Sequence, residues 1–118
     1  MITPQIIAFL SIEDEEPDLV VSFALEPHGS HSITLLRTPR YEAILPEEER
    51  GVAVMSGNQC SPRELLLSIA ITPEEVVIQS QARTHRLSAS KLSGEDRTEA
   101  VNMLKRMNFD GRFVINAA

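Results

Sequence analysis

The chain has 118 residues and a mass of 13.1 kDa, which suits one domain and is too short for two full ones. Hydrophobic residues make up 42% of the chain and charged residues 24%, a composition typical of folded globular proteins and not of disordered ones. The net charge of -6 argues against binding to nucleic acids or anionic membranes, because the protein as a whole would repel them.

The first half of the chain predicts strands with one buried face. Residues 5–12 are apolar, and residues 18–26 alternate between apolar and polar side chains with a period of two. The acidic stretch 13–17, which ends in proline, predicts a turn between these two runs and therefore a first hairpin. The turn residues at 27–30 and the alternation over 31–37 predict a second hairpin.

The middle of the chain is less regular. Pro39 and Pro46 limit regular structure around residues 41–45, which we expect to form a short strand or an irregular loop. Residues 47–51 predict one helical turn ended by glycine, followed by a short strand at 52–55. Residues 64–71 predict a central strand with the apolar residues at odd positions on one side, leading through short loops to strands at 76–80 and 84–89.

One segment predicts a helix. Residues 95–107 carry apolar side chains at helical spacing, Ser93 is suited to cap the first turn, and Asn108 is suited to end the helix in a left-handed conformation. Residues 112–115 predict a last strand. The whole chain, residues 1–118, is thus expected to be a single α+β domain with a mainly antiparallel β-sheet of about six to eight strands and one C-terminal α-helix near 95–107.

The charge is distributed unequally between the two halves. Residues 1–59 contain three basic and ten acidic side chains, a net -7, whereas residues 60–118 contain eight basic and seven acidic ones, a net +1. Two acidic clusters in predicted connections predict a docking surface for a basic protein partner, because a negative patch speeds association. The alternative is a solvated, self-repelling loop. The residues are Glu13, Asp14, Glu15, Glu16, Glu47, Glu48 and Glu49.

A second hypothesis is a small ligand-binding protein or enzyme. Arg37, Arg40 and Tyr41 combine two guanidinium groups with an aromatic ring, a set that can hold a phosphate or a carboxylate. The alternative is that these arginines form ion pairs with Glu42 and with the glutamates at 47–49.

Histidines would complete such a pocket. His28 and His31 flank a predicted turn, but no third metal ligand is specified, so we predict neither a metal nor a cofactor. His85 lies on a predicted strand face, where we expect a half-buried imidazole with a hydrogen-bond partner.

The remaining features favour a non-enzymatic protein of the cytoplasm. Cys60 is the only cysteine, so no intrachain disulfide can form, and no neighbouring base is specified that would make it a nucleophile. Nucleotide-binding and zinc-protease motifs are absent. The first residues do not resemble an export signal, and no apolar stretch approaches the roughly 20 residues that span a bilayer. Unpaired sheet edges predict a homodimer.

A strand-rich domain of this length with a late helix resembles, in architecture, lipid-binding signalling modules of the pleckstrin-homology type. Members that bind phosphoinositides use a basic connection between their first strands. The corresponding connection here is the acidic stretch 13–18, which argues against binding to a lipid headgroup. The same features fit small acidic proteins that neutralise a basic toxin or enzyme. We therefore expect an acidic interaction module that binds a basic protein.

Overall fold

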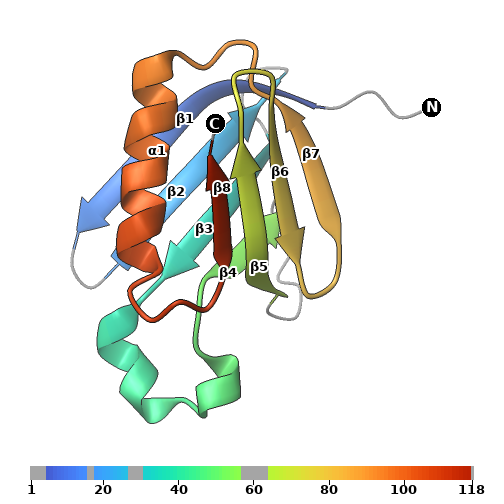
Figure 1. Ribbon diagram of the computed structural model, residues 1–118. Helices are drawn as coiled ribbons and strands as arrows, with labels where there is room; N and C mark the ends of the chain where they lie inside the picture. Colours follow the sequence, from blue (N-terminus) through green and yellow to red (C-terminus); the bar gives the residue numbers. More distant parts are fainter. Residues whose placement is uncertain (1–4, 16–17, 27–30, 57–63, 118) are drawn as a thin grey trace.

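The computed structural model describes residues 5–15, 18–26, 31–56 and 64–117 (Figure 1). These residues form eight strands, two short 3-10 helices and one α-helix. The helices are η1 (Pro39–Ile44), η2 (Glu47–Glu49) and α1 (Gly94–Met107). The strands are β1 (Gln5–Glu15), β2 (Asp18–Leu25), β3 (His31–Arg37), β4 (Ala53–Ser56), β5 (Glu64–Ile71), β6 (Glu75–Ser80), β7 (Thr84–Ser88) and β8 (Val114–Ala117).

The sheet closes on itself. Strands β1 to β4 form one antiparallel meander, and β5 to β7 form a second one. The start of β5 pairs with β4, and β1 pairs in parallel with β7, so these seven strands form a closed ring. The second half of β5 pairs in parallel with β8. The predicted fold class, α+β with a mainly antiparallel sheet and one late helix, is confirmed.

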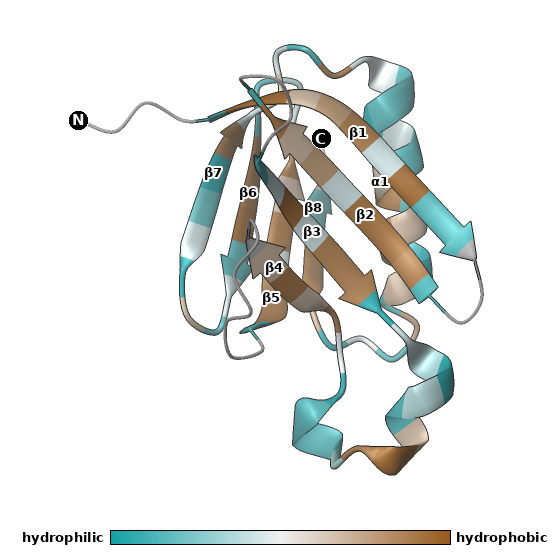
Figure 2. Ribbon diagram, turned by 180° about the vertical axis from the view of Figure 1, so that it is seen from behind, coloured by the Kyte–Doolittle hydropathy of each residue, from teal (hydrophilic) through white to brown (hydrophobic). Residues whose placement is uncertain are grey.

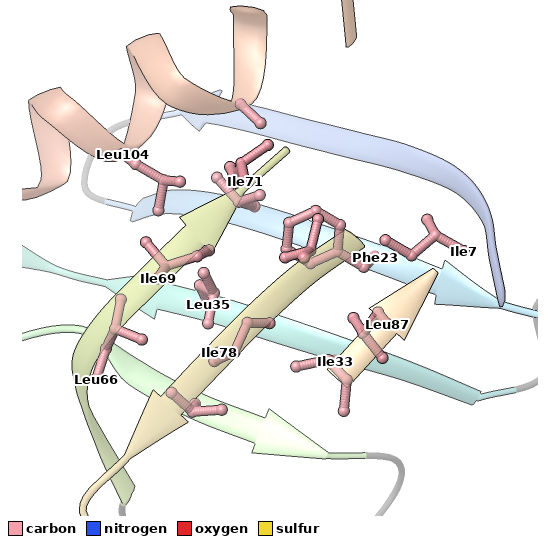
Figure 3. Close-up of a cluster of buried hydrophobic side chains, with 14 of the residues drawn as sticks. Ile7, Phe23, Ile33, Leu35, Leu66, Ile69, Ile71, Ile78, Leu87 and Leu104 are labelled. Carbon is pink, nitrogen blue, oxygen red and sulfur yellow. The ribbon is translucent and has the colours of Figure 1, made fainter. Parts of the chain in front are cut away.

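One hydrophobic core fills the space between the two meanders. Alternate residues of the facing strands point inward, and Figure 3 shows Phe23 and Leu35 from the first meander opposite Ile69 and Ile78 from the second. Helix α1 covers one end of this core with four buried side chains. They are Ala100, Met103, Leu104 and Met107.

Of the two predicted caps of the helix, the first is confirmed and the second is wrong. Ser93 caps α1 as expected, because its side chain accepts a hydrogen bond from the backbone N–H of Asp96 while the Asp96 carboxylate accepts one from the N–H of Ser93. Asn108 is not left-handed, with φ -96°. Instead Gly111, with φ +69°, adopts that conformation in the turn toward β8, which begins at Val114 and not at residue 112.

Two stretches predicted as loops have regular structure. Strand β1 continues to Glu15, since Glu13 and Asp14 pair with Val20 and Leu19 of β2, so the acidic residues lie in a strand and not in a turn. An antiparallel ribbon tolerates charge there because its side chains reach solvent. Residues 39–44 form a 3-10 helix and not a strand.

The predicted alternation of β5 is wrong in its first half. A β-bulge between Leu66 and Ser68 shifts the side chains by one position. Glu64 and Leu66 therefore point inward and Leu67 is 43% exposed, whereas Ile69 is buried as predicted. This shift places a carboxylate inside the end of the barrel.

Candidate functional site

Residues 38–51, between β3 and β4, form a segment that extends beyond the barrel (Figure 1), and we call it the protrusion. Pro39 lies in the first turn of η1 and Pro46 precedes η2, so neither short helix can continue into the other. Gly51 ends the segment with φ +139°, a conformation that suits glycine. The predicted helical turn at 47–51, ended by glycine, corresponds to η2 and Gly51.

The protrusion is fixed at its base by Arg37, a side chain that is 1% exposed. Its Nε and Nη2 atoms each donate to the Glu42 carboxylate at 2.8 Å, and Nη1 and Nη2 each donate to the Asp110 carboxylate at 2.8 Å. A further bond of 2.8 Å runs from Nη1 to the carbonyl oxygen of Met107. The guanidinium carbon lies 4.1 Å from the centre of the Phe109 ring.

These contacts use every donor that Arg37 has. A guanidinium carries five N–H groups, and all five have an acceptor within the protein. Burial by itself would lower the pKa of Arg37, but the hydrogen bonds to Asp110 and Glu42 outweigh it and raise the pKa. The hydrogen bond from Arg37 in turn holds the pKa of Asp110 well below its usual range. The cluster ties the protrusion to the end of α1.

Two further arginines hold the far part of the protrusion. Arg50 donates from Nε and Nη2 to the carbonyl oxygen of Leu45, at 3.1 and 2.9 Å. Arg112, which precedes β8, donates from Nη1 to the carbonyl oxygens of Glu47 at 3.0 Å and of Arg50 at 3.4 Å. The protrusion is thus connected to the C-terminal part of the chain through Arg37 and Arg112.

The outer surface of the protrusion combines apolar and acidic side chains. Ile44 is 83% exposed, the largest exposed fraction among the described large hydrophobic residues, and Tyr41 is 54% exposed. Glu47, Glu48 and Glu49 are exposed beside them. Figure 2 shows this segment as a mainly hydrophilic ribbon with one hydrophobic stretch at its far end.

The second predicted acidic cluster lies near the base of the protrusion. The Thr38 hydroxyl donates to the Asp18 carboxylate at 2.8 Å, which joins the start of β2 to the start of the protrusion. Glu13 and Asp14 are exposed at the end of the neighbouring strand β1. The side chain of Glu15 and all of Glu16 lie outside the described residues. The two acidic clusters therefore lie at the same end of the first meander.

Several acidic side chains of residues 1–59 form ion pairs within the protein. Asp14 forms an ion pair with Arg106 of α1, which lowers the pKa of Asp14. Glu26 pairs with Lys91, and Glu47 lies 3.8 Å from Arg112. Among the described residues, Glu13, Glu48 and Glu49 have no such ion pair. Some acidic side chains of the first half therefore pair with basic side chains of the second half.

The fold does not bring together the residues predicted to form a ligand-binding pocket. Arg40 and Tyr41 are exposed on the protrusion. All the donors of Arg37 are bound to acceptors within the protein, and one of these acceptors is Glu42, as the alternative of ion pairing predicted. His31 is exposed at the opposite end of β3. His28 and Cys60 lie outside the described residues. A cavity of about 60 Å³ adjoins Tyr41, and Glu42 and Glu49 line it, so it is small and acidic.

A separate polar cluster occupies the barrel end where β5 starts. The inward carboxylate of Glu64 accepts a 2.9 Å hydrogen bond from Ser80 and lies 3.0 Å from Nε of Arg83. His85 is half-buried as predicted, but its Nε2 atom is buried and has no hydrogen-bond partner in the described part of the chain. Burial lowers the pKa of His85, against the opposing charge of Glu64. The predicted partner of His85 is therefore absent at Nε2.

The described residues contain no group of three or more side chains placed to hold a metal ion. Within the same residues, no helix is long and apolar enough to cross a membrane. Neither a family model, nor a curated protein, nor a solved structure matches this chain.

Ile44 is the main residue that the sequence analysis missed. It lies outside any periodic pattern, between two prolines that prevent a regular strand. An isolated isoleucine in such a segment has no predicted partner in the core. That lack of a place in the core was the only available signal of its exposure.

Proposed function

We propose that the protein is a non-enzymatic interaction module of the cytoplasm that docks a basic protein partner through the protrusion and the neighbouring acidic end of β1 and β2. The observation that carries this proposal is the exposure of Ile44 on a segment that three arginines hold in place. A partner that covers this side chain would remove its apolar surface from water, and that burial favours association.

The rigidity of the protrusion supports the proposal. Binding costs free energy when loops and side chains become ordered, and a segment that is already ordered avoids much of that cost. Arg37 and Arg112 hold the protrusion against the end of α1 and the approach to β8, so its exposed side chains are presented in one arrangement.

The surface chemistry indicates the kind of partner. Ile44 and Tyr41 can supply the apolar and aromatic contacts that dominate interface energetics. The surrounding glutamates, with Glu48 and Glu49 lacking an ion pair among the described residues, would attract a positively charged surface and increase the association rate. A basic protein with a shallow apolar depression fits both features.

Affinity capture from an extract of the source cells tests this proposal. The bait is compared with two variants, Ile44→Ser and the triple variant E47Q/E48Q/E49Q. The matched control is E74Q/E95Q/E99Q, which removes the same charge from glutamates away from the protrusion. We expect a protein with a net positive charge to be retained by the wild type and the control and lost by both protrusion variants. Equal retention by all four baits would contradict the proposal.

A further inference from the structure

Strand β8 ends the sheet and has a partner on one edge only. Its residues Val114 to Ala117 pair with Ser68 to Ile71 of β5, and no described strand pairs with the other edge. In any strand, alternate residues direct their N–H and C=O groups to opposite edges. The outer edge of β8 therefore offers backbone donors and acceptors to a further strand.

A groove of about 410 Å³ lies between this end of the sheet and α1. In both ribbon views α1 lies on the side of β8 that faces away from β5 (Figures 1 and 2). Ile71 and Ala117 contribute to the groove from the sheet, and Val101 contributes an apolar side chain from the helix. The four residues of β8 extend over about 13 Å. Of these four residues Ala117 lines the groove, so the groove meets β8 at the end of the strand.

The polar lining of the groove is basic although the protein is acidic. Arg97 and Lys105 lie two turns apart on the face of α1 that lines the groove, with Asn102 between them, and no acidic residue among the described ones lines it. Arg97 also donates to the carbonyl oxygen of Leu92 at 3.1 Å, which fixes its guanidinium near the start of the helix. Lys105 is exposed. The two cations complement a negatively charged ligand.

We propose that this groove binds an acidic, extended segment of a second protein, which adds as a strand to the outer edge of β8. The backbone of the segment pairs with β8, side chains on one of its faces contact Val101 and Ala117, and carboxylates meet Arg97 and Lys105. This site is separate from the protrusion and has the opposite charge. The protein would accordingly join a basic partner to an acidic one.

Selection from a library of random decapeptides, with the full chain as bait, tests this inference. We expect the enriched peptides to carry several Asp or Glu residues and to shift the backbone amide resonances of β8 and of the groove face of α1. The best peptide is then made with N-methyl groups on alternate residues, which keeps its charge but removes backbone donors. This form should lose binding.

Two double variants separate the groove from general electrostatic attraction. R97Q/K105Q should weaken binding of the selected peptide by about tenfold. R86Q/K91Q removes the same charge from two exposed side chains outside the groove and the protrusion, and it should leave the affinity within about twofold. Because Arg97 contacts Leu92, the single variant Lys105→Gln, at an exposed position, is measured as well and should weaken binding in the same direction.

Four results would overturn the inference. They are enrichment of no peptide, enrichment of peptides without acidic residues, resonance shifts that fall outside β8 and α1, and unchanged binding of the N-methylated peptide. Concentration-dependent shifts of β8 without peptide would show that a second copy of this chain occupies the edge instead. The test of the protrusion uses different residues, so either proposal can fail alone.

Discussion

Replacing Arg37 with Met should destabilise the fold more than any other single change of a charged residue. Arg37→Met leaves the buried carboxylate of Glu42 without its two donors and the carbonyl oxygen of Met107 without its bond. Removing one partner of a buried ion pair costs about 3–5 kcal/mol. The unfolding entropy of a chain of 118 residues is about 0.25 kcal/mol per degree, so the melting temperature should fall by about 12–20 °C.

Urea unfolding followed by circular dichroism measures this loss. The matched control is Arg40→Met, at an exposed arginine with no ion pair among the described residues, and it should change the free energy of unfolding by less than about 0.5 kcal/mol. The double variant R37M/E42M removes both buried charges and should recover part of the stability lost in Arg37→Met. A loss below about 1 kcal/mol in Arg37→Met would refute the role assigned to this cluster.

Three further predictions concern the dependence of stability on pH and the effect of replacing glycine. Because the hydrogen bond from Arg37 lowers the pKa of Asp110, its stabilising contribution is full above about pH 4 and is lost as the pH falls further. Asp110→Asn should therefore flatten the acid limb of a plot of unfolding free energy against pH, and an unchanged limb would contradict the pairing. Because burial lowers the pKa of His85, the unfolded chain takes up a proton below about pH 6.5 that the folded chain does not, so stability falls between pH 7 and pH 5. His85→Leu should reduce that slope, and a slope equal to that of the wild type would show that His85 is not the source. Gly111→Ala should cost about 1–2 kcal/mol through backbone strain alone, since its added Cβ meets no atom within 4 Å. Gly94→Ala, at an ordinary backbone conformation in α1, should be neutral or stabilising by up to about 1 kcal/mol, and urea unfolding that reverses this order would contradict both assignments.

The parts of the fold that depend on neighbouring residues were predictable from the sequence. The alternation of β2 and the capping box at Ser93 depend on residues within a few positions of one another. The bulge in β5 was not predictable, because this strand pairs with three others and its register satisfies all of them together. The parallel pairing of β8 with β5 likewise joins residues far apart in the chain.

The candidate site shows the same division between local and distant causes. Arg37, Tyr41 and the glutamates at 47–49 were selected by residue type, and the fold places all of them on or at the base of one segment. The role of Arg37 depends on Asp110, which lies 73 residues further along the chain, so no local pattern could reveal that its donors are occupied. The exposure of Ile44 depends on where the protrusion ends in space.

The kinetics of association with the basic protein retained in affinity capture test the central claim most directly. Stopped-flow association is followed over a salt series for the wild type, for E47Q/E48Q/E49Q and for the control E74Q/E95Q/E99Q. Salt screens exposed charges over about 10 Å at 0.1 M. The wild-type association rate should fall as salt is added, and E47Q/E48Q/E49Q should associate more slowly and depend less on salt, with little change in dissociation. Equal rates and equal salt dependence for all three proteins would contradict docking through the acidic protrusion.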